Sequence, residues 1–77
     1  MAVGFVLITT EPGAEVSVRE AVSEIEHVAG QWIVFGMHDL FVKVEAEDEE
    51  ELTKCVVQDI RSIEGIAETR TLIGAEI

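Results

Sequence analysis

The chain opens with an uncharged, largely apolar run, Ala2-Val3-Gly4-Phe5-Val6-Leu7-Ile8-Thr9. Successive side chains of a strand point to opposite faces, and here both alternating sets are apolar. That pattern is typical of a strand that is covered on both faces. The turn-forming sequence Glu11-Pro12-Gly13 ends the run. We therefore predict a strand over residues 2–9, covered on both faces.

Two later segments have the apolar periodicity of amphipathic helices. Pro12 suits the first turn of the earlier helix, and Gly30 is expected to end it. Its apolar stripe is Val18, Ala21, Val22, Ile25 and Val28. Asp48, with Glu51 three residues later, predicts a capped start for the second helix, which Gly65 ends. The stripe of this helix is Leu52, Cys55, Val56, Ile60 and Ile63.

Three further segments are predicted to be strands, and they complete a β-α-β-β-α-β order: residues 31–35, 40–46 and 67–73. This order predicts one α+β domain over residues 1–77, a ferredoxin-like sandwich. Its four-stranded antiparallel sheet would have the fourth, first, third and second strands side by side. Both helices would cover one face, leaving either Phe5 and Leu7 or Val6 and Ile8 on the other. We therefore expect the chain to dimerise through the sheet.

The composition excludes several classes of function. The chain has 77 residues, with 5 Lys and Arg against 16 Asp and Glu, and a net charge of −11. Such a surface repels phosphate backbones and anionic membranes, so we expect no direct nucleic-acid or membrane partner. One cysteine permits no disulfide within the chain. No signal peptide or membrane span is predicted, and we expect a cytoplasmic protein.

The residues that could carry chemistry form no catalytic or metal-binding pattern, so we predict neither an enzyme nor a cofactor. Cys55 lies in an apolar stripe, and the acidic run from Glu47 to Glu51 lacks the spacing of a calcium loop. His38 and Asp39 lie in a predicted hairpin, where Asp39 would either cap its own turn or contact a ligand. Thr69-Arg70-Thr71 would be a half-exposed strand or the donors of a small polar pocket.

Three segments together resemble the effector-binding (RAM) domain of the Lrp/AsnC feast/famine regulators. They are Thr10-Glu11-Pro12-Gly13; Phe35-Gly36-Met37-His38-Asp39-Leu40 followed by Val42-Lys43-Val44; and Ser62-Ile63-Glu64-Gly65-Ile66 followed by Thr69-Arg70-Thr71. The resemblance covers about residues 3–74. It implies a ferredoxin-like fold that dimerises through its sheet and forms larger oligomers. It also implies an amino-acid effector, bound between dimers near the Gly-x-x-Asp hairpin.

The chemistry of an amino acid suggests roles for the residues of such a site. Asp39 would accept from the ammonium group, while backbone N–H groups around Gly36 and the Thr71 hydroxyl would donate to the carboxylate. Met37 and His38 would contact the effector side chain. Thr69 completes the predicted ligand-binding set, Gly36, Met37, His38, Asp39, Thr69 and Thr71.

Most members of the family carry a helix-turn-helix domain before this one, and no such segment is predicted here. The chain thus resembles a stand-alone RAM domain. We expect it to act by forming homo-oligomers or by associating with full-length Lrp/AsnC regulators. The alternative is a small enzyme of the dimeric α+β barrel type, similar to monooxygenases or isomerases. The almost wholly apolar helix stripes disfavour that alternative, because such enzymes need polar groups between the helices and the sheet.

Overall fold

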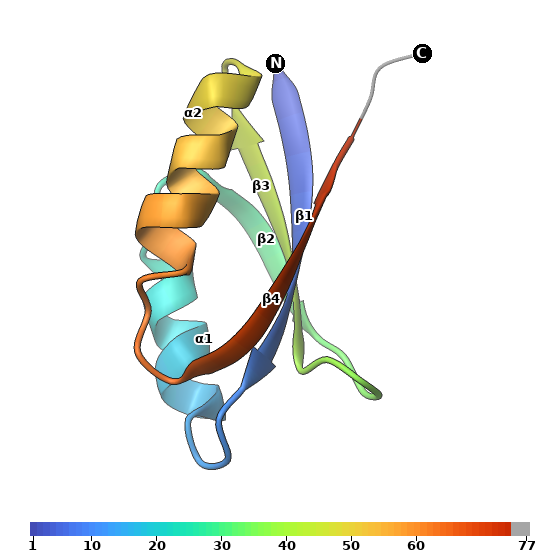
Figure 1. Cartoon of the computed structure of the whole chain (residues 1–77), viewed down its shortest axis with the longest axis vertical. Helices are drawn as coiled ribbons and strands as arrows, with labels where there is room; N and C mark the ends of the chain where they lie inside the picture. Colours follow the sequence, from blue (N-terminus) through green and yellow to red (C-terminus); the bar gives the residue numbers. More distant parts are fainter. Residues whose placement is uncertain (75–77) are drawn as a thin grey trace.

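In the computed structural model, which describes residues 1–74, one antiparallel sheet has the order β2-β3-β1-β4. The strands are β1 (Ala2–Thr10), β2 (Val28–Ile33), β3 (Leu40–Ala46) and β4 (Ile66–Ile73). The helices are α1 (Glu15–Ser23) and α2 (Glu49–Lys54), and a π-helical segment, η1 (Cys55–Ile60), continues α2. Both helices lie on the same side of the sheet (Figure 1). The predicted α+β, ferredoxin-like architecture and strand order are confirmed.

The two faces of β1 have different surroundings. Val6 and Ile8 point toward the helices and are fully buried, whereas Phe5 and Leu7 are only partly covered and lie on the open face of the sheet. The core lies between helices and sheet and consists of Ala2, Val6, Ile8, Val18, Val22, Leu40, Val42, Val44, Ala46, Leu52, Cys55, Val56 and Ile60. The structure thus decides which of the two apolar sets remains uncovered in a single chain.

The first helix is shorter than predicted. It begins after Pro12, with Ala14 as its N-cap, and ends at Ser23, while Val28 already belongs to β2. Gly30 therefore does not end a helix; it lies in β2, next to a shift in the register with β3. The periodicity was misleading because Ile25 and Val28 do pack against the core, although the chain has left the helix. The second strand is correspondingly 28–33 rather than 31–35.

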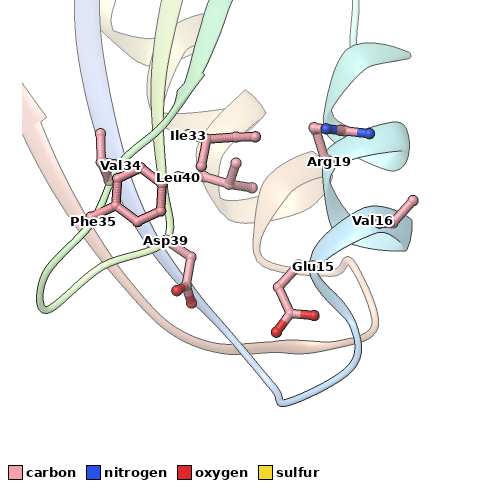
Figure 2. Close-up of a pocket in the computed structure, with 8 residues that line it drawn as sticks. All are labelled: Glu15, Val16, Arg19, Ile33, Val34, Phe35, Asp39 and Leu40. Atoms are coloured by element: carbon pink, nitrogen blue, oxygen red, sulfur yellow. The ribbon is translucent and has the colours of Figure 1, made fainter.

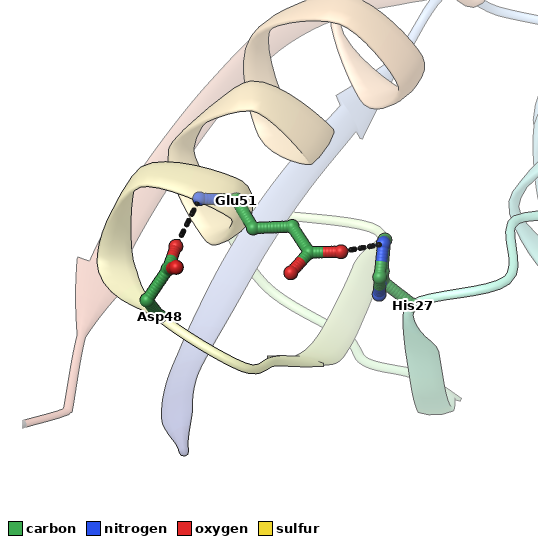
Figure 3. Close-up of polar contacts among 3 residues, drawn as sticks. All are labelled: His27, Asp48 and Glu51. Atoms are coloured by element: carbon green, nitrogen blue, oxygen red, sulfur yellow. Dashed lines mark hydrogen bonds and ion pairs between the residues drawn. The ribbon is translucent and has the colours of Figure 1, made fainter.

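The start of the second helix is confirmed, with one difference in its cap (Figure 3). Asp48 Oδ1 accepts a hydrogen bond of 2.8 Å from the backbone N–H of Glu51. The Glu51 carboxylate does not complete a reciprocal capping box; among residues 1–74 its partner is His27, whose Nε2 lies 3.2 Å from Glu51 Oε1. This polar contact joins the α1–β2 connection to the first turn of α2.

Gly65 provides a stability test because it has a positive φ of 99° and no room for a side chain. A Cβ at this position would lie 2.8 Å from Ala14 Cβ and 3.1 Å from Val18 Cγ2. We expect Gly65→Ala to lower the free energy of unfolding by about 2–4 kcal/mol, the sum of backbone strain and overpacking. Urea denaturation followed by circular dichroism measures the loss.

Gly13→Ala is the matched control, since Gly13 has a φ of 88° but nothing within 4 Å of an added Cβ. Backbone strain alone should cost about 1–2 kcal/mol at this position. Equal losses of stability for the two variants would show that a Cβ at Gly65 is accommodated against α1 without overpacking.

Candidate functional site

The loop between β2 and β3 contains four of the predicted ligand-binding residues, Gly36, Met37, His38 and Asp39. The backbone N–H of Val34 donates to the carbonyl of Asp39 at 3.0 Å and closes the loop. Gly36 has a φ of 134°, a conformation that L-residues rarely adopt, and the space around its Cα is open. The Met37 side chain is 89% exposed. The loop thus presents two exposed apolar side chains, Phe35 and Met37, and an accessible stretch of backbone.

Asp39 attaches this loop to the end of β1. Its Oδ2 accepts hydrogen bonds from the backbone N–H and the hydroxyl of Thr10, at 2.8 and 3.0 Å. Its own N–H donates to the carbonyl of Ile8 at 2.8 Å. Asp39 therefore caps a strand rather than its own turn. No residue between 1 and 74 donates to Oδ1, so the second carboxylate oxygen has remaining acceptor capacity.

His38 makes a second attachment to β1, on the other side of the strand. Its Nδ1 lies 3.1 Å from Thr9 Oγ1, and the same hydroxyl donates to the carbonyl of Met37 at 3.2 Å. The Thr9 hydroxyl thus lies within hydrogen-bond distance of both the His38 ring and the Met37 carbonyl. The loop is thus fixed through both Thr9 and Thr10, which point to opposite faces of the sheet.

Thr69 and Thr71 lie on β4, away from this loop. Thr69 is paired with Ile8 and Thr71 with Val6, so both point toward the helix side of the sheet. Since β1 separates β4 from β3, Thr69 is roughly 10 Å from the start of β3, two strand spacings away. Thr71 Oγ1 is buried and has no hydrogen-bond partner among the described residues. Within one chain, the structure does not bring these threonines to Asp39.

A pocket of about 260 Å³ lies beside the loop, between α1 and the neighbouring ends of β2 and β3. Its lining combines apolar side chains with three charged ones: Glu15, Val16, Arg19, Ile33, Val34, Phe35, Asp39 and Leu40. Figure 2 shows Glu15 and Asp39 at one edge of the pocket, with Ile33 and Leu40 between α1 and the loop. Sequence reasoning identified Asp39 but not Glu15 or Arg19, whose spacing of four residues places them on one face of α1.

A second group of titratable side chains surrounds the junction of α2 and η1. His27, Glu51, Lys54, Cys55, Gln58 and Asp59 line a polar hollow there. Burial, the negative charge of Asp59 and a hydrogen bond to Asp59 raise the pKa of the Cys55 thiol to about 11. The thiol is thus a poor nucleophile at neutral pH. Residues 1–74 contain no cluster of three or more His, Cys, Asp or Glu arranged to hold a metal ion.

The open face of the sheet has an aromatic centre. The ring of Phe41 lies 5.3 Å from that of Phe5 and 5.9 Å from that of Trp32, measured between centroids. The strand register also places four charged residues on this face, Lys43, Glu45, Glu68 and Arg70. Their charges sum to zero. In the described part of the chain, the only contact at salt-bridge distance is the one between His27 and Glu51, so these four charged residues have no such partner.

Comparisons with known proteins identify a family of transcription regulators. The family model described as the Lrp/AsnC ligand binding domain matches residues 3–76. The HTH-type transcriptional regulator PF0250 of Pyrococcus furiosus is 33% identical over 72 residues, which cover 90% of this chain and 48% of the regulator. The chain spans about half the length of the regulators that it matches in sequence. Among the described residues, neither helix has the length and apolar character of a membrane span.

Two solved structures extend the comparison. The crystal structure of TTHA0845 from Thermus thermophilus is 36% identical with a TM-score of 0.93, covering 100% of this chain and 96% of that chain. The complex of the transcriptional regulator NMB0573 with L-Met, from Neisseria meningitidis, is 13% identical with a TM-score of 0.87. It covers 97% of this chain and 50% of the regulator, and at this identity the likeness concerns the fold alone.

The attachment of the loop to β1 predicts how Asp39 variants behave without any ligand. Asp39→Ala removes the acceptor for Thr10 and should lower the free energy of unfolding by about 1.5–3 kcal/mol, the range for hydrogen bonds to a charged group. Asp39→Asn keeps an oxygen at this position and should lose clearly less. Thermal and urea denaturation measure both variants. A loss as large for Asn as for Ala would show that the charge, rather than the acceptor geometry, secures the loop.

Proposed function

This chain belongs to the Lrp/AsnC ligand-binding domain family, and we propose that it binds an amino acid as its effector. The observation that carries this proposal is the free Oδ1 of Asp39, held beside a pocket by the hydrogen bonds of Oδ2 to Thr10. A carboxylate oxygen fixed in this way is a ready acceptor for an ammonium group. The complex of NMB0573 with L-Met supports an amino-acid effector for a protein of this fold.

The proposed site is centred on the loop from Gly36 to Asp39. Asp39 accepts from the effector ammonium, and the open backbone at Gly36 lets the effector approach closely. Met37 and His38 contact the effector side chain. Thr69 and Thr71 lie across β1 from this loop, so they join the site only as residues of a neighbouring copy. Both threonines remain part of the proposed site because the buried hydroxyl of Thr71 has no hydrogen-bond partner among the described residues and is available to an effector.

We further propose that copies of the chain assemble through the open face of the sheet. Two chains with a net charge of −11 repel each other through most of their surfaces. The open face is the exception, because its four charges sum to zero around an apolar, aromatic centre. The same face could receive a longer Lrp/AsnC regulator in place of a second copy, since the relatives contain this domain within about twice its length.

The side chains of the domain fit a binding function better than an enzymatic one. The layer between the helices and the sheet is filled by aliphatic side chains, and the one buried thiol has a raised pKa. Regulators, rather than enzymes, are the relatives of the chain. The net charge of −11 repels the phosphate backbone of DNA. We therefore propose that this domain binds the effector and assembles, while another domain or another polypeptide contacts DNA.

Assembly can be tested at the centre of the open face. We expect light scattering of the unmodified chain at micromolar concentration to give the mass of a dimer or a larger oligomer. Phe41→Glu should weaken the association at least about 100-fold, because it buries an unpaired charge from each copy. Val57→Glu, on the helix side, makes the same change at an exposed apolar residue and should leave the mass unchanged. A stable monomer of the unmodified chain would refute the proposed assembly.

Effector binding can be tested by screening the twenty amino acids in thermal denaturation. An effector at 100 times its Kd should stabilise the native state by about 2.7 kcal/mol. For the amino acids that stabilise the chain, we expect Asp39→Asn to weaken binding about 10- to 100-fold in calorimetry, because the ammonium loses its charged partner. If no amino acid raises the melting temperature, the proposed function is wrong. If one does and Asp39→Asn binds it equally well, the site lies elsewhere.

A further inference from the structure

Trp32 provides an aromatic surface at one edge of the open face. Its side chain is 52% exposed, and its ring lies 5.9 Å from the ring of Phe41, measured between centroids. The ring also covers Gly30, because a Cβ built on this glycine would lie 3.1 Å from Trp32 Cη2. The absence of a side chain at Gly30 thus lets the ring lie against the sheet. Gly30 and Phe41 support the ring, and about half of the side chain remains available to a partner.

Arg70 lies at the opposite edge of the same face. The strand register forms one row of side chains across the sheet, in the order Trp32, Phe41, Leu7 and Arg70. The two ends of this row are three strand spacings apart, or about 14 Å, so Trp32 and Arg70 do not meet within one chain. Arg70 is exposed, and no carboxylate among residues 1–74 lies at salt-bridge distance from it.

A two-fold axis that runs along the strands brings the two ends of this row together. Sheets packed face to face usually keep their strands within about 30° of each other, so the axis of a symmetric pair runs either along the strands or across them. An axis along the strands, midway between β3 and β1, places β2 of one copy over β4 of the other. Trp32 then faces Arg70 of the second copy, and in an isologous interface this contact occurs twice.

An axis across the strands gives poorer contacts for the two cations of the face. If the axis passes through the row of Arg70, the two copies of Arg70 face each other, and if it passes through the next row, the two copies of Lys43 do. Like charges that meet in an interface oppose association. Between the rows, the axis places Arg70 against Leu72. An axis along the strands instead places Arg70 against Trp32 and Lys43 against Phe5, so each cation meets an aromatic ring.

We propose that two copies of the chain associate about a two-fold axis along their strands, with Trp32 of each copy stacked against the Arg70 guanidinium of the other. This inference rests on the proposed assembly through the open face and adds to it the orientation of the copies and the residue pair that selects it. Tryptophan attracts cations more strongly than the other aromatic residues, and the attraction increases when water is excluded. A guanidinium is weakly hydrated and stacks readily on such a ring.

Cross-linking of cysteine variants determines which residues face each other. Packed sheets lie about 10 Å apart, beyond the reach of a disulfide, so the reagent is a short bismaleimide. It is added at a concentration at which light scattering shows that both variants associate. We expect Trp32→Cys mixed with Arg70→Cys to give pairs that contain one chain of each variant, identified by intact mass. The unmodified chain is the control, because its only cysteine, Cys55, is 2% exposed.

The cation contact is tested by the strength of association. Arg70→Gln should raise the dissociation constant in sedimentation equilibrium about 10- to 100-fold, because both contacts of the symmetric pair are lost. Trp32→Leu should have a similar effect, and the double variant should be little weaker than either single variant, since both changes remove the same contact. Arg61→Gln makes the same change of net charge at an exposed residue at the end of η1. It is the matched control and should leave the dissociation constant unchanged.

The outcomes separate this inference from the proposed assembly. If the mixture gives no mixed pair, or if one cysteine variant cross-links to itself instead, the proposed orientation is wrong. If Arg70→Gln associates as tightly as the Arg61→Gln control, the contact with Trp32 is wrong. Neither result affects assembly through the open face, which Phe41→Glu tests. If the unmodified chain is a monomer, the proposed assembly fails and this inference fails with it.

Discussion

β1 has apolar side chains on both faces, and the chain has only one layer of helices with which to cover them. Removing a large aliphatic or aromatic side chain from water contributes about 1.5–3 kcal/mol, so both faces favour burial. The helices bury Val6 and Ile8 completely and leave Phe5 and Leu7 on the open face. The proposed assembly through that face supplies the second layer. One central strand thereby contributes both to the core of the chain and to the proposed interface.

Charge distribution follows the same division into two faces. The open face is neutral, so the net charge of −11 belongs to the rest of the chain, including the helix layer. Electrostatic repulsion thus opposes contacts through the helices and is smallest at the open face. The hydrophobic effect and the electrostatics therefore select the same surface, whose composition favours association with another copy over binding to a polyanion.

The end of β1 also connects the open face to the proposed effector site. Thr9 lies on the open face and is hydrogen-bonded to His38, while Thr10 lies on the helix side and is hydrogen-bonded to Asp39. The loop from Gly36 to Asp39 is thus attached to two adjacent residues of the strand that carries the proposed interface. An effector that contacts Asp39 acts on the same short segment as a partner that covers the open face. This arrangement gives a physical basis for coupling binding to assembly.

The amino-acid sequence by itself determined the order of the elements and most of the helix side chains that face the core. The alternation in β1, the cap at Asp48 and the stripe around Val18 and Val22 are local patterns, and local sterics and hydrogen bonds decide them. The end of α1 was mispredicted because periodicity reports which side chains are buried, and Val28 is in contact with the core from a strand.

Tertiary structure alone decided the features that depend on contacts between distant segments. Glu51 was expected to cap its own helix, but it pairs with His27 because the α1–β2 connection passes beside α2. Within one chain Thr69 lies two strands from the start of β3, because the strand register places β1 between β3 and β4. The pocket joins Arg19 of α1 to Asp39 of the β2–β3 loop. No local pattern marks such a pair, because their proximity arises only when the helix packs on the sheet.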